Sequence, residues 1–344
     1  MKIQDLVREN IKTLQPYSSA RDEFEGLKKD MVFLDANENP FNNGVNRYPD
    51  PQHYRIRELL SSIRKIRIQH ILLGNGSDEV LDLIFRVFCE PKVDNVITLP
   101  PTYGMYGVLA NINNVDTVEV QLDENFQPRV DAILEAANEN SKILFLCSPN
   151  NPTANSFESA KIERLIEEFK GIVVIDEAYI DFTEEESWIR KLKKYPNLIV
   201  IQTLSKAYGM AGIRLGICYA SEYITSMLNR IKPPYNVNEL TQQRAAKILL
   251  YTEGLKREVN VILEEREQLI KSLESISFIE KIYPTNANFI LVKVDNANKR
   301  YAELIKHGIV VRNRTTQPLC ENCLRLTVGT SNENRKLIYA LKQL

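Results

Sequence analysis

Short apolar runs alternate with amphipathic segments through the middle of the chain. The runs are rich in Val and Ile and mostly lack polar alternation, which is typical of strands covered on both faces. We predict strands at residues 96–99, 115–120, 143–146, 172–175, 198–201 and 215–219. Helical periodicity between several of them predicts helices at residues 77–89, 129–138 and 158–169. This order predicts an α/β fold with a mostly parallel sheet and helices on both faces.

The pattern changes after Asn238, which suggests a second unit. Residues 239–275 are expected to form one or two long charged helices that lead away from the sheet. Four further strands are predicted at residues 278–283, 289–294, 309–312 and 324–328, with a final helix from about residue 332. These elements predict a smaller α+β domain, although the pattern leaves its strand pairing open.

Three regions follow from this pattern. Residues 1–45 are predicted to be an N-terminal arm and part of the small domain, because residues 15–16 and 37–46 are poor in regular structure. Residues 46–238 are predicted to be the large domain, and 239–344 the interdomain helix and C-terminal small domain. The arm is expected to join the smaller domain or a partner subunit.

Composition narrows the class of protein. The 344 residues suggest about two domains, and 44% hydrophobic with 26% charged residues is ordinary for a soluble globular protein. A formal net charge of −1 gives no support for a nucleic-acid or anionic-membrane partner. The first ten residues lack the apolar core of a signal peptide, and no stretch reaches the roughly 18 apolar residues of a membrane span. We predict a cytoplasmic protein.

The five cysteines are expected to be reduced thiols, because an odd number in a chain of this size does not indicate a disulfide framework. Cys320 and Cys323 form a C-x-x-C pair that invites a metal or redox interpretation. With only three histidines and no second such pair, the sequence favours a hairpin that happens to hold two thiols, and no metal site is predicted.

Lys206 has the most informative surroundings in the chain. Thr203 and Ser205 flank Leu204 just before it, and Arg214 follows eight positions later, so three phosphate donors surround one amine. A lone lysine is usually a solvated surface group, and Arg214 alone is as compatible with a capping role. Together these residues are what a protein needs to hold pyridoxal phosphate, with the lysine as a Schiff base on its aldehyde.

Asp176 closes the apolar run at residues 172–175. A carboxylate at the end of a buried strand is costly unless it is paired with a cation, and the pyridinium nitrogen of the cofactor is such a cation. Tyr179 and Asn151 are placed to reach the ring hydroxyl. The alternative is that Asp176 is a helix cap or part of a structural ion pair. The presence of Lys206 thirty residues later favours the cofactor role over this alternative.

A glycine-rich segment, GNGSDE at residues 74–79, precedes a predicted helix. Its glycines allow close backbone approach, and the first free N–H groups of the helix can bind a phosphate. Taken alone, the segment is equally consistent with a turn followed by an acidic N-cap. Its position ahead of the other motifs favours the phosphate site, because ligands of such sheets gather at the carboxyl ends of strands.

These motifs, taken as a set, resemble the histidinol-phosphate aminotransferases, a family of fold-type I pyridoxal-phosphate enzymes. The matching segments run from Leu14 to Thr330 in the order of that family. They are LQPYSSAR, LDANENP, RYPD, LLGNGSDEVLDLIFRVFCEP, PPTYGMY, CSPNNPT, DEAYIDF, TLSKAYGMAGIRLG and LRLTVGT.

The resemblance implies a role for each matched residue. It makes Lys206 the catalytic Schiff-base lysine and places Asp176 on the pyridinium nitrogen. The other implied cofactor contacts are Ser77, Asp78, Tyr103, Asn151, Tyr179, Thr203, Ser205 and Arg214, with Tyr48 contributed by the partner subunit of a homodimer. The implied substrate contacts are Tyr17, Asn151, Arg312 and Arg325.

The implied reaction moves an amino group reversibly between L-glutamate and imidazole-acetol phosphate, giving 2-oxoglutarate and L-histidinol phosphate in L-histidine biosynthesis. One position departs from the family pattern: the glycine usual after SPNNPT is Ala154 here. If that position needs a positive φ, alanine costs on the order of 1 kcal/mol.

Three alternatives stay open at this stage. A phosphothreonine-type decarboxylase has similar cofactor residues, as does an aromatic or broad-specificity aminotransferase. A non-enzymatic regulator that binds the cofactor is a rival from another class. An appended basic DNA-binding segment would favour the regulator, and the chain has no such run.

Overall fold

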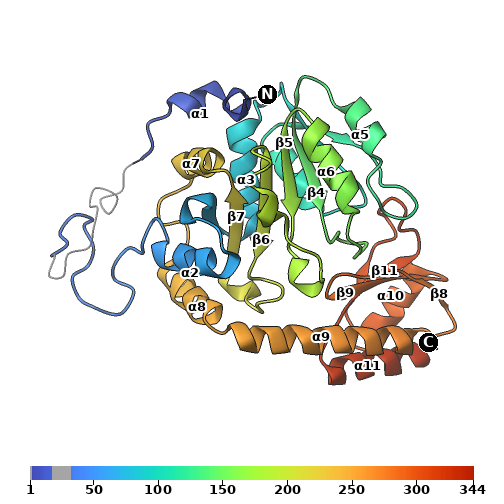
Figure 1. The fold of residues 1–344 in the computed structure, drawn as a ribbon. Helices are drawn as coiled ribbons and strands as arrows, with labels where there is room; N and C mark the ends of the chain where they lie inside the picture. The colour runs from blue at the N-terminus through green and yellow to red at the C-terminus, as the bar shows by residue number, and fades with distance from the viewer. Residues whose placement is uncertain (1, 18–31) are drawn as a thin grey trace.

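The computed structural model describes residues 2–17 and 32–344. Within them, the strands form one seven-stranded and one four-stranded sheet (Figure 1). The larger has the order β1-β7-β6-β5-β4-β2-β3. Its strands are β1 (Ile71–Asn75), β2 (Asn95–Thr98), β3 (Asp116–Glu119), β4 (Ser141–Cys147), β5 (Ile172–Asp176), β6 (Leu198–Thr203) and β7 (Leu215–Ala220).

Most of the large sheet is parallel. Strands β3, β2, β4, β5 and β6 pair in parallel, whereas β7 runs antiparallel to both β6 and β1. The predicted mostly parallel sheet is therefore confirmed. Strand β1 was not predicted, because its run of apolar residues ends in the glycine-rich segment that we had assigned to the phosphate motif.

Helices cover both faces of this sheet and create two hydrophobic cores. One face carries α2 (Tyr54–Arg64), α5 (Val130–Ala136), α6 (Ser159–Glu168) and α8 (Glu239–Leu249). The other carries α3 (Ser77–Phe88), α4 (Met105–Ile112) and α7 (Glu222–Ile231). Successive strand residues alternate between the cores: Leu144 faces the first, and Phe145 faces the second. This double burial is why the strands have no polar alternation.

The smaller unit contains an antiparallel sheet with the order β10-β11-β9-β8. Its strands are β8 (Ile279–Ile282), β9 (Phe289–Val294), β10 (Arg312–Asn313) and β11 (Cys323–Thr327). Helices α10 (Ala297–Lys306), α11 (Ser331–Lys342) and the end of α9 (Thr252–Leu273) supply its core. Figure 1 shows α9 running from the large unit to the small one, with α11 beside it. The predicted strand at 309–312 is wrong except for its last residue, because Val310 faces solvent and only Arg312 pairs.

The start of the arm lies on the large unit, in contrast to our expectation. It forms a 3-10 turn, η1 (Ile3–Leu6), and a short helix, α1 (Glu9–Thr13). Leu6 and Ile11 are buried in the core beneath α3 and α7, and Arg8 Nε donates to Glu90 Oε2 at 2.9 Å. The apolar residues of this segment are spaced to cover the large unit, so residues 3–13 do not belong to the small domain. The three-region division of the remaining chain stays a prediction.

Candidate active site

A cavity of about 560 Å³ opens between the large sheet and the small sheet. Its lining comes from the carboxyl ends of three adjacent parallel strands, from the first turns of α3 and α4, and from β10 and β11. The sequence predicted this edge, because ligands of parallel α/β sheets bind where strands end. The strand-end residues in the lining are Cys147, Asp176 and Thr203. Other lining residues include Ser77, Tyr103, Arg312 and Arg325.

Asp176 is the last residue of β5 and is 4% exposed. Its carboxylate accepts hydrogen bonds from Tyr106 Oη at 3.0 Å and from the Ala178 N–H at 3.1 Å. Burial raises the pKa of Asp176 to about 6, while these hydrogen bonds and the charge of Lys206 act in the opposite direction. A carboxylate in this position is stabilised by an incoming cation.

Tyr106 was missed by the sequence argument. It is fully buried on α4 and stacks on Phe145 with ring centroids 4.7 Å apart. Burial, followed by the charge of Asp176, raises the pKa of Tyr106 well above its usual value, so the hydroxyl stays a donor. No local signal in the sequence marks Tyr106, because its hydrogen bond to Asp176 joins residues 70 positions apart.

Lys206 follows β6 in a tight turn. Leu204 is fully buried, its N–H donates to Leu215 O at 3.1 Å, and its carbonyl accepts from the Met210 N–H at 2.9 Å. These bonds direct Lys206 into the cavity, with Nζ 5.6 Å from the centre of the Tyr179 ring. Partial burial and the charge of Arg325 lower the pKa of Lys206. A lowered pKa increases the fraction of neutral, nucleophilic amine.

The start of α3 and the beginning of β7 meet very closely. Gly76 has a φ of +84°, and a Cβ there would lie 2.8 Å from Arg214 Nη2. A Cβ on Gly216 would lie 2.3 Å from the backbone nitrogen of Ser77. Both glycines are therefore needed for the approach. Arg214 Nη2 lies 3.7 Å from Asp78 Oδ2, which places a guanidinium over the helix N-terminus and its free N–H groups.

Two predicted cofactor contacts have structural partners within the protein. The Thr203 hydroxyl donates to Leu215 O at 3.3 Å and accepts from the Ser205 N–H at 3.1 Å, so it orders the turn before Lys206. Tyr103 Oη donates to Asp78 Oδ1 at 3.1 Å, and its ring faces the cavity. Thr203 and Tyr103 both line the cavity, so both remain predicted cofactor contacts.

The structure brings Asn151 and Arg325 together although 174 residues separate them. Arg325 Nη1 donates to Asn151 Oδ1, and its guanidinium lies 5.1 Å from the centre of the Phe289 ring. Arg312 pairs in register with Arg325 across β10 and β11 and lies exposed at the rim of the cavity. Arg314 also lines the cavity, and the sequence argument did not include it.

Two predicted residues lie away from this cavity. Tyr17 is 74% exposed and Tyr48 is 52% exposed, and neither is part of the lining in this chain. Residues 18–21 of the LQPYSSAR motif lie outside the described residues. Tyr48 stacks on Tyr235 with ring centroids 4.5 Å apart.

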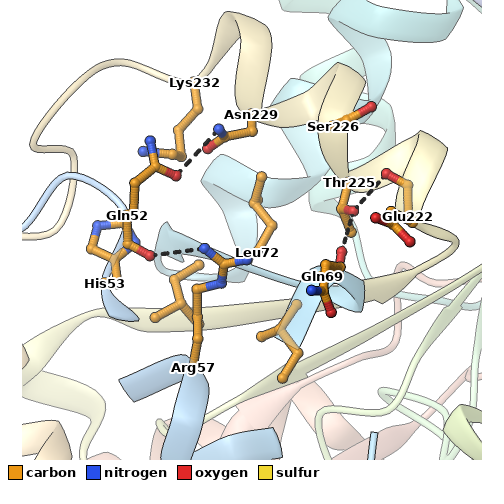
Figure 2. Close-up of a pocket in the computed structure, with 12 residues that line it drawn as sticks. Gln52, His53, Arg57, Gln69, Leu72, Glu222, Thr225, Ser226, Asn229 and Lys232 are labelled. Atoms are coloured by element: carbon orange, nitrogen blue, oxygen red, sulfur yellow. Dashed lines mark hydrogen bonds between the residues drawn. The ribbon is translucent and has the colours of Figure 1, made fainter. Parts of the chain in front are cut away.

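A second cavity, of about 200 Å³, lies between α2 and α7 (Figure 2). Its polar side chains hold the backbone that leads into α2. Arg57 Nη1 donates to Gln52 O at 3.2 Å, and Lys232 Nζ donates to Pro51 O at 3.1 Å. Asn229 Nδ2 donates to the Gln52 side chain at 3.3 Å. These bonds fix residues 51–52, which directly follow the RYPD segment.

Ala154, which stands where the family pattern has glycine, adopts a positive φ. Its φ is +68°. Its N–H donates to Asn150 O at 2.8 Å, and its carbonyl accepts from the Asn286 N–H at 2.7 Å. A left-handed alanine is disfavoured by about 1–2 kcal/mol. The surrounding hydrogen bonds hold the turn, and Asn151 reaches the cavity despite this strain.

The cysteines lie in apolar surroundings. All five are free and buried, with Cys320 in the turn before β11 and Cys323 at its first position.

Within residues 2–17 and 32–344, none of the helices has the length and apolar character needed to cross a membrane.

Comparison with known proteins gives concordant matches. Residues 30–341 match the model of the family described as aminotransferase class I and II. The chain is 64% identical to a histidinol-phosphate aminotransferase of Flavobacterium johnsoniae, over 99% of this chain and 98% of that protein. It is 61% identical to one of Flavobacterium psychrophilum, over 99% of both. The crystal structure of the Clostridium acetobutylicum histidinol-phosphate aminotransferase superimposes with a TM-score of 0.80 at 27% identity, covering 87% of this chain and 90% of that one.

Proposed function

Because the chain belongs to the class I and II aminotransferase family, we propose that it transfers an amino group between L-glutamate and imidazole-acetol phosphate. The products are 2-oxoglutarate and L-histidinol phosphate, and the reaction is a step of L-histidine biosynthesis. The observation that carries this proposal is one cavity in which Lys206 and Asp176 face the cross-strand pair Arg312 and Arg325.

The cavity fits pyridoxal 5′-phosphate. A buried carboxylate with a raised pKa suits a pyridinium nitrogen, and the close approach at Gly76 suits a phosphate on the first turn of α3. When bound, this cofactor supplies an aldehyde that captures an amine and a ring that accepts electrons. The residues proposed to hold it are Ser77, Asp78, Tyr103, Asn151, Asp176, Tyr179, Thr203, Ser205, Lys206 and Arg214.

Two side chains of this set have the central chemical roles. Asp176 would stabilise a positive charge on the cofactor's ring nitrogen, because its carboxylate is buried and is oriented by Tyr106. Lys206 would hold the cofactor through its amine, and the free amine would accept a proton from the substrate and return it. The lowered pKa of Lys206 favours this task, because the free amine is the base.

The substrate's anionic end is proposed to bind the arginines. Arg325 is held by Asn151 and by the face of Phe289, so its guanidinium is oriented before a substrate arrives. Arg312 lies opposite it, at the rim, where a phosphate has access. Tyr17 is proposed to approach the phosphate from the N-terminal arm, on the basis of the family pattern.

We also propose a homodimer in which Tyr48 serves the partner's cavity. Tyr48 is half exposed and is absent from the lining of its own cavity. Its N–H donates to Glu38 Oε1 at 2.6 Å, and Asp50 O accepts from Gln242 Nε2 at 3.0 Å, so its segment is held in place. Mixing Tyr48→Phe with Lys206→Ala subunits tests this. A heterodimer should then contain one site with both defects and one with neither, and activity should rise above that of both parents. If heterodimers form without any gain, Tyr48 does not act across the interface.

Product analysis distinguishes the proposed reaction from its closest rivals. With L-histidinol phosphate and 2-oxoglutarate, the purified protein should form L-glutamate in equal amount to imidazole-acetol phosphate. Phosphothreonine should release no carbon dioxide above the rate without enzyme. Carbon dioxide release would instead identify a decarboxylase, and faster turnover of phenylalanine than of histidinol phosphate would identify an aromatic aminotransferase.

A further inference from the structure

The edge of the small sheet presents a third arginine to the substrate end of the cavity. Arg312 pairs in register with Arg325, and Arg314 lies two residues beyond Arg312. Alternate residues of an extended segment point to the same side. The intervening Asn313 confirms this alternation, because its Nδ2 donates to Asn298 Oδ1 on α10 at 2.7 Å, away from the cavity. All three arginines line the cavity.

The backbone around Arg314 is fixed by hydrogen bonds. Its N–H donates to Cys323 O at 2.9 Å, and its carbonyl accepts from the Gln317 N–H at 2.9 Å. The Asn322 N–H donates to Thr315 Oγ1 at 2.8 Å across the same loop. Arg314 is thus held next to β11 and its Arg325, and the loop is built to keep the guanidinium at the cavity.

The charges at this end of the cavity are not balanced by acids. Among the described residues that line it, the acidic ones are Asp78 and Asp176, which lie with Arg214 and Tyr106 respectively. The Nε atoms of Arg314 and Arg325 are buried without a hydrogen-bond partner in the protein. Like charges placed across neighbouring strands are destabilising, so the arrangement favours an incoming anion.

The electrostatics agree with this geometry. Burial, followed by the charge of Arg312, lowers the pKa of Arg314. Burial, followed by the charge of Arg314, lowers the pKa of Arg325. Each guanidinium therefore experiences its neighbours as repelling charges, and a dianion between them would relieve that repulsion.

We propose that Arg314 is a specificity-determining residue that completes, with Arg312 and Arg325, a three-arginine site for the substrate phosphate. The inference rests on the proposed function and adds a residue to it. A phosphate monoester carries close to two negative charges and three terminal oxygens on one group. Glutamate instead carries its two negative charges on two separate carboxylates. Three neighbouring guanidinium groups match the charge and the oxygens of the phosphate, whereas a single carboxylate neutralises only part of their positive charge.

Arg314→Gln tests the proposal, because glutamine keeps a polar side chain and removes the charge. The variant should lose about ten- to a hundredfold in kcat/KM for L-histidinol phosphate and less than about threefold for L-glutamate. Arg314→Lys should recover part of the loss, since it restores the charge without the planar fork. Arg335→Gln, on the exposed side of α11, is the matched control and should change neither substrate.

Inorganic phosphate provides a second measurement that does not depend on histidinol phosphate. As a competitive inhibitor against glutamate, it should bind the wild-type protein more tightly as pH rises through its second ionisation. Arg314→Gln should bind it at least about tenfold more weakly and with a flatter pH dependence. Equal losses for both substrates, or unchanged phosphate inhibition, would overturn the role of Arg314. Failure of wild-type protein to convert histidinol phosphate would overturn the proposed function, while the inhibition measurement would still decide whether Arg314 binds phosphate.

Discussion

Lys206→Ala is expected to lose nearly all transamination, with kcat lower by about a thousandfold or more. Lys206 is proposed both to hold the cofactor and to move the substrate proton, and positioned proton transfer alone contributes about 10²–10⁴-fold. The turn that carries it is fixed by Leu204, so alanine removes the amine without disturbing the backbone. The absorption band that the bound cofactor gives to the wild-type protein should disappear together with turnover.

A fold control separates loss of chemistry from loss of structure. Lys206 opens on the cavity and contributes little to the core, so the cofactor-free variant should unfold at about the wild-type temperature. Lys336→Ala, on the exposed surface of α11, removes a lysine elsewhere and should retain full activity. A Lys206→Ala protein that keeps both the absorption band and turnover would exclude this lysine as the cofactor's attachment point.

Asp176→Asn should lower kcat/KM by roughly a hundredfold or more. The amide cannot stabilise a protonated ring nitrogen, and electrostatic contacts aimed at developing charge are typically worth 10²–10³-fold. Steady-state rates with glutamate measure this loss. An effect below about tenfold would show that the Asp176 charge is not required for the reaction, and would favour a structural role for the carboxylate.

The same substitution should have the opposite effect on the stability of the cofactor-free protein. The pKa of Asp176 is raised to about 6 in the folded state, compared with about 3.9 when unfolded. Between these values the folded state binds more protons, so this group makes stability fall as pH rises from about 4 to 6. Cofactor-free Asp176→Asn should therefore be more stable than wild type at pH 7, by about 3 kcal/mol, and the difference should vanish at about pH 3. Thermal unfolding at the two pH values measures it.

The large unit was predictable because its signals are local. Strands buried on both faces have continuous apolar runs, and the residues between 203 and 214 lie together in the sequence as well as in the structure. Strand β10 was harder, because two paired residues leave almost no periodicity and its neighbour Val310 faces solvent. Residues 3–13 of the arm were misplaced, because a segment predicted from its lack of regular structure carries no sign of the surface on which its apolar residues pack.

The parts of the site that were missed depend on pairing between distant segments. Arg314 becomes recognisable only when Arg312 is known to face Arg325, since then the alternation of β10 places it on the same side. Tyr106 becomes recognisable only when α4 is packed against β5, which brings its hydroxyl to Asp176. The residues Tyr17 and Tyr48 were assigned from the resemblance, and their roles stay proposals.

A single-turnover experiment tests the central claim most directly. Cofactor-loaded protein is mixed with excess L-histidinol phosphate in the absence of 2-oxoglutarate, and the products are quantified after quenching. One imidazole-acetol phosphate should form per Lys206 site, and the reaction should then stop. An unquenched portion, freed of the excess L-histidinol phosphate and then given 2-oxoglutarate, should form one L-glutamate per site. Continued turnover without 2-oxoglutarate, release of carbon dioxide, or no product from histidinol phosphate would contradict the proposed amino transfer.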